Sequence, residues 1–314
     1  MDVSNIMDLN HIYNDQFSYS LPRTVLENFI AGTEFDHKMP YTIEESQNLQ
    51  ADITDIYQRI IDQKPNHQQL AVMTAGAPGA GKTTLMRADR DKLHATGIDT
   101  AYICPDDICL RQMSRTWKRE IDATEKSQED RLNTYNKWRP GSNAACHLIL
   151  ANLILNRCSF HFGTTSTGAQ TKYFLSFLKT HGYQIRLLHI TAPDDVRWAS
   201  VDLRNKGEEG REGFIQSTEK DTRDKGVLFP QRIRDTYLEY ADEIEFYYRD
   251  RADADARLSA RWIRTTGDNQ PMGKLEITSD QDYNRIVEQH NRVVGELKLP
   301  ELTWENTVLK HSHQ

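Results

Sequence analysis

A glycine-rich turn between an apolar run and a helix-forming segment constrains the fold of this chain more than any other feature. Residues 70–87 read LAVMTAGAPGAGKTTLMR, and residues 76–83 match the pattern G-x-x-x-x-G-K-[S/T] at every fixed position. Glycines let the backbone curl with its N–H groups pointing inward, and the start of the following helix adds positive partial charge. The stretch therefore predicts a phosphate-binding loop that follows a buried strand.

The side chains of this loop predict specific contacts with ATP or GTP. Lys82 would reach the β- and γ-phosphates, and the Thr83 hydroxyl would bind Mg²⁺. The alternative is a chance glycine turn, which requires four fixed residues to fall in register between a strand and a helix by accident. The predicted nucleotide-binding residues are Gly76, Ala77, Pro78, Gly79, Ala80, Gly81, Lys82, Thr83 and Thr84.

Composition narrows the classes of protein and partner. Among 314 residues, 38% are apolar and 27% are charged, and no apolar run approaches the roughly 18 residues of a membrane span. The acidic start, MDVSNIMDLN, lacks the basic and apolar regions of a signal peptide, so we expect a cytoplasmic protein, with export without a cleaved signal left open. The net charge of −7 argues against a duplex nucleic-acid partner.

The cysteines and three central histidines show no metal-binding spacing. We expect Cys104, Cys109, Cys146 and Cys158 to be buried free thiols in a reducing compartment. The simplest interpretation of His147, His161 and His189 is structural.

Strands that alternate with helices predict an α/β fold. The expected strands are 70–73, 99–104, 158–162, 184–191 and 243–248. The expected helices are 83–94, 144–156, 170–181, 194–206 and 231–241, with a chain break at 139–143. We expect a parallel P-loop kinase-type sheet with helices on both faces, plus helical N- and C-terminal extensions.

The predicted domain organisation has three parts, namely a helical N-terminal extension (1–67), a P-loop kinase domain (68–265), and a linker with a C-terminal helical segment (266–314). Helices are expected over 22–31, 42–62 and 280–297, the second opened by a Thr42–Glu45 capping box. The apolar stripe of helix 42–62 predicts either ordinary packing on the core or a fused regulatory segment.

A pair of carboxylates follows the second expected strand. In open α/β sheets the active site lies beyond the carboxyl ends of the strands, and a phosphoryl-transfer enzyme needs a carboxylate there to deprotonate or orient the acceptor hydroxyl. Asp106 and Asp107 occupy this place. The alternative role for either residue is to cap a helix that begins near Ile108.

The sequence resembles the zeta toxin-like P-loop kinases over roughly residues 68–250. The matching features are the loop at 76–83, Pro105-Asp106-Asp107 after a strand, Ser142-Asn143 before a long apolar stretch, Gly163-Thr164 after a strand, and Ala192-Pro193 with Arg204 twelve residues after Ala192. The resemblance implies ATP or GTP and Mg²⁺ as cofactors, and it implies an antitoxin protein as a partner. Residues 1–64 are a second candidate for that restraint.

The resemblance also implies roles for individual residues. Asp106 would be the base on a sugar hydroxyl and, with Thr83, a metal ligand, and Asp107 would be a cap or Mg²⁺ neighbour. Arg204 would be the first lid arginine over the phosphates; Arg211, Arg223 and Arg232 are candidates for the second. The implied catalytic set is Asp106, Lys82, Arg204 and Arg223, and the implied acceptor-binding set is Asp107, Ser142, Asn143, Gly163, Thr164 and Thr165.

Two departures from the family pattern leave the acceptor open. Phe162 stands where an acidic residue commonly helps to hold a nucleotide sugar, and Ala144 stands where an arginine can follow Ser-Asn. We expect a kinase of a nucleotide-sugar or related nucleotide hydroxyl. The alternatives are a kinase of NAD or another nucleoside, and a degenerate nucleotide-binding protein whose helical ends dock a partner.

Overall fold

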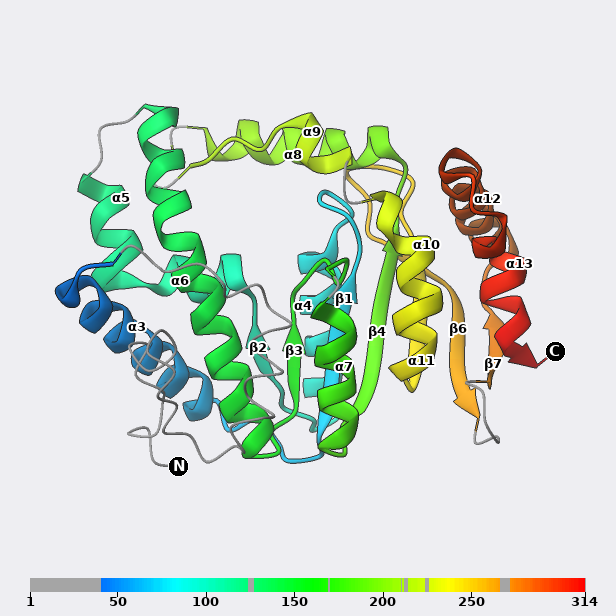
Figure 1. Ribbon diagram of the computed structural model, residues 1–314, viewed down its shortest axis with the longest axis horizontal. Coiled ribbons are helices and arrows are strands. Elements are labelled where there is room, and N and C mark those ends of the chain that lie inside the picture. Colours follow the sequence, from blue (N-terminus) through cyan, green and yellow to red (C-terminus); the bar gives the residue numbers. More distant parts are fainter. Residues whose placement is uncertain are drawn as a thin grey trace. The chain divides into compact units, whose positions relative to one another are not determined.

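The structure is a computed structural model, and it describes residues 41–123, 127–168, 170–209, 211, 214–223, 226–265 and 272–313 (Figure 1). The helix expected at 22–31 lies outside these residues. Two compact units are present. Of the described residues, unit 1 contains 41–69 together with those of Lys92–Phe162 and Glu208–Gln216, and unit 2 contains those of Leu70–Asp91, Gly163–Gly207 and 217–313.

Unit 2 carries a mostly parallel sheet in the order β1-β4-β5-β6-β7-β8. Its parallel part is β1 (Leu70–Ala75), β4 (Gln184–Thr191) and β5 (Glu243–Tyr248). The strands β6 (Arg257–Thr265) and β7 (Met272–Ile277) continue it antiparallel, and β8 (Ser312–His313) pairs parallel with β7. The P-loop kinase-type parallel sheet is therefore confirmed, and an antiparallel extension that the sequence analysis did not predict is added to it.

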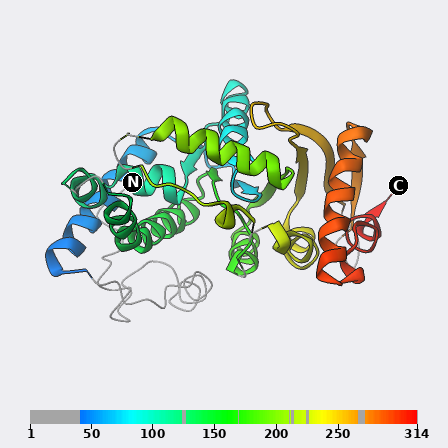
Figure 2. The same cartoon turned by 90° about the horizontal axis from the view of Figure 1, so that it is seen from above.

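The helices of unit 2 follow the expected alternation. They are α4 (Lys82–Ala95, which runs past the end of the unit), α7 (Gln170–Thr180), α8 (Asp194–Glu208), α9 (Glu219–Arg223), α10 (Phe229–Arg232), α11 (Leu238–Tyr240), α12 (Asp280–Leu297) and α13 (Trp304–Thr307). Figure 2 shows α12 and α13 side by side, where the backbone N–H of Trp304 donates to Asn291 over 2.8 Å. In the part of the chain that the structure describes, no helix combines the length and apolar character needed to cross a membrane.

An ionic cluster ties the P-loop helix to the sheet. Arg186 of β4 pairs with Asp89 of α4 and lies 3.2 Å from Glu245 of β5. Both carboxylates are at least 95% buried, so their charges need this cation. The cluster fixes the rotation of α4, and with it the direction in which the loop preceding α4 emerges from β1.

Unit 1 is built on two short parallel strands, β2 (Ala101–Ile103) and β3 (Phe160–Phe162). Around them lie α3 (Ile43–Asp62), α5 (Arg119–Ala123) and α6 (Gln128–Leu155). All four cysteines of the chain are buried with free thiols, as predicted.

Helix α3 begins with the expected capping box and buries its apolar stripe. The Thr42 hydroxyl accepts the Glu45 N–H over 3.2 Å, and the Glu45 carboxylate accepts the Thr42 N–H over 2.8 Å. The stripe packs against α6, β2 and the turns beyond β2. Its residues Leu49, Ile53, Ile56, Tyr57 and Ile60 are at most 4% exposed. This is the packing role among the two alternatives for the stripe.

The chain break expected at 139–143 is wrong, because α6 runs through Pro140 without interruption. A proline removes one backbone donor and crowds the carbonyl one turn earlier. Here the Tyr41 hydroxyl enters the opened turn: it donates to the Lys137 carbonyl over 2.7 Å and accepts the Gly141 N–H over 3.1 Å. The Tyr41 ring stacks on Trp138 with ring centroids 4.7 Å apart. A side chain distant in sequence thus supplies the bonds that this turn lacks.

Asp52 of α3 holds the helical turn Ser114–Lys118. Its buried carboxylate accepts the N–H groups of Arg115 and Thr116 over 2.9 and 3.1 Å, and the Thr116 hydroxyl over 2.7 Å. Replacing Asp52 by alanine leaves these buried donors without an acceptor. We therefore expect a loss of about 3 kcal/mol in the free energy of unfolding. Chemical denaturation measures this loss. Asp55→Ala removes the exposed carboxylate that pairs with the Arg115 side chain and is the matched control, with an expected loss of at most about 1 kcal/mol. Equal losses in the two variants would contradict the assignment.

Candidate active site

The loop after β1 adopts a conformation that depends on its glycines. Every residue of β1 is buried, and α4 begins at Lys82. Gly79 and Gly81 have φ angles of +80° and +97°, a region that residues with a side chain rarely adopt. A Cβ atom on Gly79 would lie 2.3 Å from the backbone oxygen of Arg197. Gly79 is therefore a glycine for a local steric reason as well as a conformational one, and the motif residue Gly81 is a glycine for its positive φ.

Gly79→Ala should deform this loop. The positive φ costs about 1–2 kcal/mol for alanine, and the contact with the Arg197 carbonyl forces a further backbone shift. We expect a greater loss of unfolding free energy than in Gly97→Ala, because Gly97 has a similar φ of +82° with no atom within 4 Å of an added Cβ. Thermal and chemical denaturation measure both variants. Equal destabilisation would show that the contact with Arg197 carries no weight.

Three cationic side chains bind the carbonyl groups of the loop. Lys82 Nζ donates to the Ala77 oxygen over 3.0 Å, Arg197 Nη1 to the Pro78 oxygen over 3.4 Å, and Arg249 Nη1 to the Gly79 oxygen over 3.0 Å. Both arginines are at least 90% buried. In a trans peptide the C=O and N–H groups point in opposite directions, so the contacts with Arg197 and Arg249 turn the next N–H groups away from these two cations. Of these two groups, the Ala80 N–H donates to the Ala77 carbonyl over 3.2 Å, and the orientation of the Gly79 N–H is the one that a phosphate cradle needs.

The turn at 163–168 is bonded to β1 and the start of the loop. The Gly76 N–H donates to the Thr165 carbonyl over 3.2 Å, and the Thr74 hydroxyl donates to the Thr164 carbonyl over 2.8 Å. The Thr164 hydroxyl accepts the Ser166 N–H over 3.2 Å, and the Ser166 hydroxyl donates to the Thr74 carbonyl over 2.7 Å. Several of the polar groups expected to hold an acceptor thus brace the turn itself. Gly163, Thr164 and Thr165 remain half-buried.

In unit 1 the carboxylates after β2 lie on one helical turn, Pro105–Cys109. This turn begins at Pro105, so neither aspartate caps a helix near Ile108 as the alternative had it. The Asp106 side chain is 64% exposed and forms an ion pair with Arg139 of α6. Asp107 instead accepts the Tyr102 hydroxyl over 3.1 Å and is partly buried. Of the pair, Asp106 is the carboxylate that faces solvent.

Helix α6 supports this turn through Ser142. The Ser142 hydroxyl is fully buried and donates to the Pro105 carbonyl, while Asn143 is half-buried. Arg139 stands one turn earlier on the same helix, and burial lowers the pKa of its guanidinium. The expected pair Ser142-Asn143 therefore lies beside Asp106, but Ser142 contacts the backbone and is not open to an acceptor.

The lid arginines differ in what they contact. Arg204 of α8 is exposed and donates to the Ser217 hydroxyl over 2.7 Å. The Arg232 side chain donates to the Thr167 carbonyl over 2.7 Å. The Arg211 carbonyl accepts from Arg131 over 3.0 Å, and the Arg223 side chain lies outside the described residues. Arg204, the residue that the family spacing indicates as the first lid arginine, is thus exposed.

Sequence reasoning missed three arginines of these two clusters, namely Arg139, Arg197 and Arg249. Arg249 directly follows β5, so its place at the carboxyl end of a parallel strand was a usable signal. Arg197 and Arg139 sit on helices with no motif to separate them from solvated charges. Among the described residues, no group of three or more His, Cys, Asp and Glu is arranged to hold a metal ion.

Comparison with known proteins decides the family. The family model of the Zeta toxin matches residues 54–248, which is more than half of the chain. The chain belongs to the Zeta toxin family. This match covers the glycine-rich loop at 76–83, both carboxylates after β2 and α8. No curated protein matches the chain at a significant level.

Solved structures of other proteins have a similar fold. A chain from the PezAT chromosomal toxin–antitoxin system of the human pathogen Streptococcus pneumoniae is 15% identical, with a TM-score of 0.56, covering 84% of this chain and 98% of that one. The AvrRxo1-ORF1:AvrRxo1-ORF2 structure with sulphate ions is 14% identical, with a TM-score of 0.56 and 87% of each chain covered. The AvrRxo1 structure with ATP is 10% identical, with a TM-score of 0.53, covering 82% of this chain and 76% of that one. The fold is that of the zeta toxin-like P-loop kinases.

Proposed function

We propose that this chain is a kinase that transfers the γ-phosphoryl group of ATP or GTP to a hydroxyl of a nucleotide-like acceptor. The observation that carries the proposal is the loop at 76–83, with two glycines at positive φ and its carbonyls bound by Lys82, Arg197 and Arg249. Family membership and the ATP held by a neighbour of the same fold support it.

In the proposed reaction, the oxygen of the acceptor hydroxyl bonds to the γ-phosphorus while the hydroxyl proton passes to the Asp106 carboxylate. The bond between that phosphorus and the bridging β–γ oxygen breaks, and the nucleoside diphosphate leaves. Arg139 orients the Asp106 carboxylate through its ion pair, so Arg139 is proposed as a positioning residue. Lys82 and Arg204 would stabilise negative charge on the transferring group.

The residues present fit a phosphate-bound Mg²⁺. Mg²⁺ in such sites uses one or two protein oxygens together with phosphate oxygens and waters, and Thr83 is exposed at the start of α4, directly after the loop. We propose Thr83 as a ligand and Asp106 as a second ligand or neighbour. When bound, the ion would neutralise phosphate charge during transfer.

The acceptor is proposed to be a nucleotide sugar, with NAD or another nucleoside as the second candidate. A specific observation favours the second: Phe162 and Ala144 are buried at 5% and 0% exposure, and the Phe162 ring packs edge-on against His147 at 6.3 Å. Neither position offers the charge that the family pattern places there.

Incubation of the purified chain with Mg·ATP or Mg·GTP and each acceptor class tests the proposal. Mass spectrometry would detect a gain of one phosphoryl group on UDP-N-acetylglucosamine, on NAD or on a nucleoside. Nucleotide binding without transfer to any acceptor would favour a degenerate nucleotide-binding protein instead. Absence of Mg·nucleotide binding by calorimetry would overturn the kinase.

We also propose a protein partner that restrains the activity. The PezAT neighbour comes from a toxin–antitoxin system, and the AvrRxo1 neighbour was solved as an ORF1:ORF2 complex. Expression of the chain should slow growth of a host cell, and Lys82→Ala should abolish that effect. Growth inhibition of equal size in Lys82→Ala would separate any toxicity from phosphoryl transfer.

A further inference from the structure

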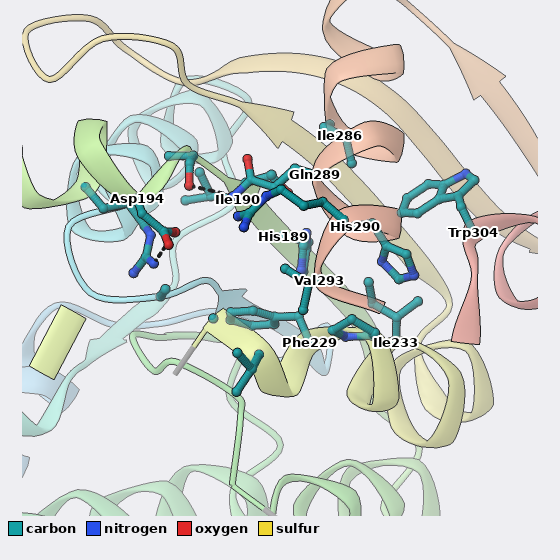
Figure 3. Close-up of a pocket in the computed structure, with 18 of the residues that line it drawn as sticks. His189, Ile190, Asp194, Phe229, Ile233, Ile286, Gln289, His290, Val293 and Trp304 are labelled. Carbon is teal, nitrogen blue, oxygen red and sulfur yellow. Dashed lines mark hydrogen bonds and ion pairs between the residues drawn. The ribbon is translucent and has the colours of Figure 1, made fainter. Parts of the chain in front are cut away.

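Unit 2 contains a cavity that the proposed kinase chemistry does not use. It measures about 80 Å³ and lies among the carboxyl end of β4, α10 and α12 (Figure 3). A water needs about 10–15 Å³ of such space, so the cavity has room for roughly six waters, or for a small ring system. Most of its wall is apolar and is formed by Ile190, Phe229, Ile233, Ile286, Val293 and Trp304.

A buried imidazole is the main polar group of this cavity. His189 of β4 is 4% exposed, and neither ring nitrogen has a hydrogen-bond partner among the described residues. Figure 3 shows His189 at the centre of the lining, between Gln289 and Phe229, and the Phe229 ring stands edge-on to it at 5.1 Å. Burial lowers the pKa of His189 to about 3, so the ring is neutral near pH 7. A neutral imidazole carries one donor and one acceptor, and leaving them unpaired is costly.

Two further side chains that line the cavity carry acceptor atoms. Gln289 Nε2 donates to the Ala192 carbonyl over 3.0 Å, which leaves its Oε1 as an acceptor. His290 Nε2 lies 2.7 Å from the Leu302 carbonyl, so this nitrogen carries the proton and Nδ1 remains an acceptor. Both residues line the cavity.

The charged side chains of the lining are paired with one another. Arg197 lies 2.7 Å from Asp194, and Arg292 lies 2.6 Å from Glu296. These pairs balance their own charges, and the deep part of the cavity is neutral and mostly apolar. A charged occupant would lose its hydration without gaining a free counter-charge.

We propose that this cavity is a binding site for an uncharged planar heterocycle that hydrogen-bonds His189 through a ring nitrogen. Waters at the few polar atoms of His189, Gln289 and His290 would leave most of the space without favourable contacts, because most of the wall is apolar. The ring of the ligand would lie against Phe229 and Val293. Ala77 also lines the cavity, so the ligand would adjoin the phosphate loop, but the site does not depend on the proposed kinase reaction.

Three probes of similar size test the proposal on the full chain, with binding measured by calorimetry. Benzimidazole has a ring donor and acceptor, indene has the same shape without nitrogen, and benzoate is an anion. We expect benzimidazole to bind at least about tenfold tighter than indene, which is the scale of one buried hydrogen bond, and benzoate not to bind. Histidine side-chain NMR should show the His189 ring nitrogens shifting only with benzimidazole.

Two variants and one competitor complete the experiment. His189→Phe should bind benzimidazole and indene equally, while His147→Phe, which removes a buried imidazole elsewhere, should keep the tenfold preference. Val293→Phe fills the cavity from a half-buried position and should abolish binding, so the test survives if His189→Phe fails to fold. Failure of all probes to bind the wild type, or a preference that persists in His189→Phe, would overturn the proposal. Competition by Mg·ATP would assign the cavity to the donor nucleotide and overturn a separate site.

Discussion

Asp106→Asn is expected to reduce phosphoryl transfer by about 10²–10⁴-fold, because the amide cannot accept the acceptor proton. Asparagine keeps the size of the side chain and an oxygen that can accept from Arg139. Nucleotide affinity should fall much less than the transfer rate, since the phosphate loop is built from other residues and only the proposed Mg²⁺ contact of Asp106 is weakened. Single-turnover kinetics with the acceptor found in the screen measures the first quantity, and calorimetry with Mg·ATP measures the second.

Asp107→Asn is the matched control for the base. Asp107 is adjacent in sequence but partly buried against the Tyr102 hydroxyl, so its variant should keep most of the activity. Full activity in Asp106→Asn together with loss in Asp107→Asn would move the base by one residue.

Arg139→Gln separates positioning from proton transfer: it should lower kcat while the pH profile shifts, and Arg139→Lys should restore part of the rate.

Lys82→Ala is expected to reduce kcat/KM by about a thousandfold, because a cation aimed at the transferring group is lost. In the described structure Lys82 Nζ is 3.0 Å from the Ala77 carbonyl, so it already lies against the loop that would hold the phosphates. The loss should appear in nucleotide affinity as well as in turnover. This combination distinguishes Lys82→Ala from Asp106→Asn, which should affect mainly turnover.

Lys92→Ala provides the comparison for this lysine, because Lys92 is exposed in the last turn of the same helix. It changes the net charge by the same amount and should leave kcat/KM within about twofold. Equal affinity for Mg·ATP in Lys82→Ala and the wild type would remove the lysine from the donor site. Circular dichroism of each variant checks that the overall helix content is retained.

The parallel core was predictable because local patterns determine it. Buried strands β4 and β5 are continuous runs of β-forming residues, and their predicted bounds match the structure. Gly79 and Gly81 of the loop have backbone angles that few other residues tolerate. Helix α12 likewise shows a clear apolar period and was predicted with its observed bounds.

Elements whose stability depends on distant partners were not predictable. Strand β6 reads RLSARWIRT, and its arginines look like a solvated segment. In the fold, Arg257 binds Asp250 and Asp282, while Arg261 binds Glu245. The roles of Arg197 and Arg249 were not predictable for the same reason, because their partners are backbone carbonyls of the loop more than a hundred residues earlier. A sequence pattern contains no record of such pairings.

The hydroxyl inserted at Pro140 makes helix α6 dependent on a residue almost a hundred positions earlier in the chain. Tyr41 completes the turn between Arg139 and Ser142, two α6 residues whose side chains bond to the Pro105–Asp106 segment. Removing the chain before residue 65 would therefore delete a structural member of the carboxylate turn, together with Asp52. An inactive truncation would report that loss and say nothing about inhibition by the N-terminal segment. Tyr41→Phe, which removes one oxygen atom, is the smallest change that breaks these hydrogen bonds while keeping the rest of the N-terminal segment.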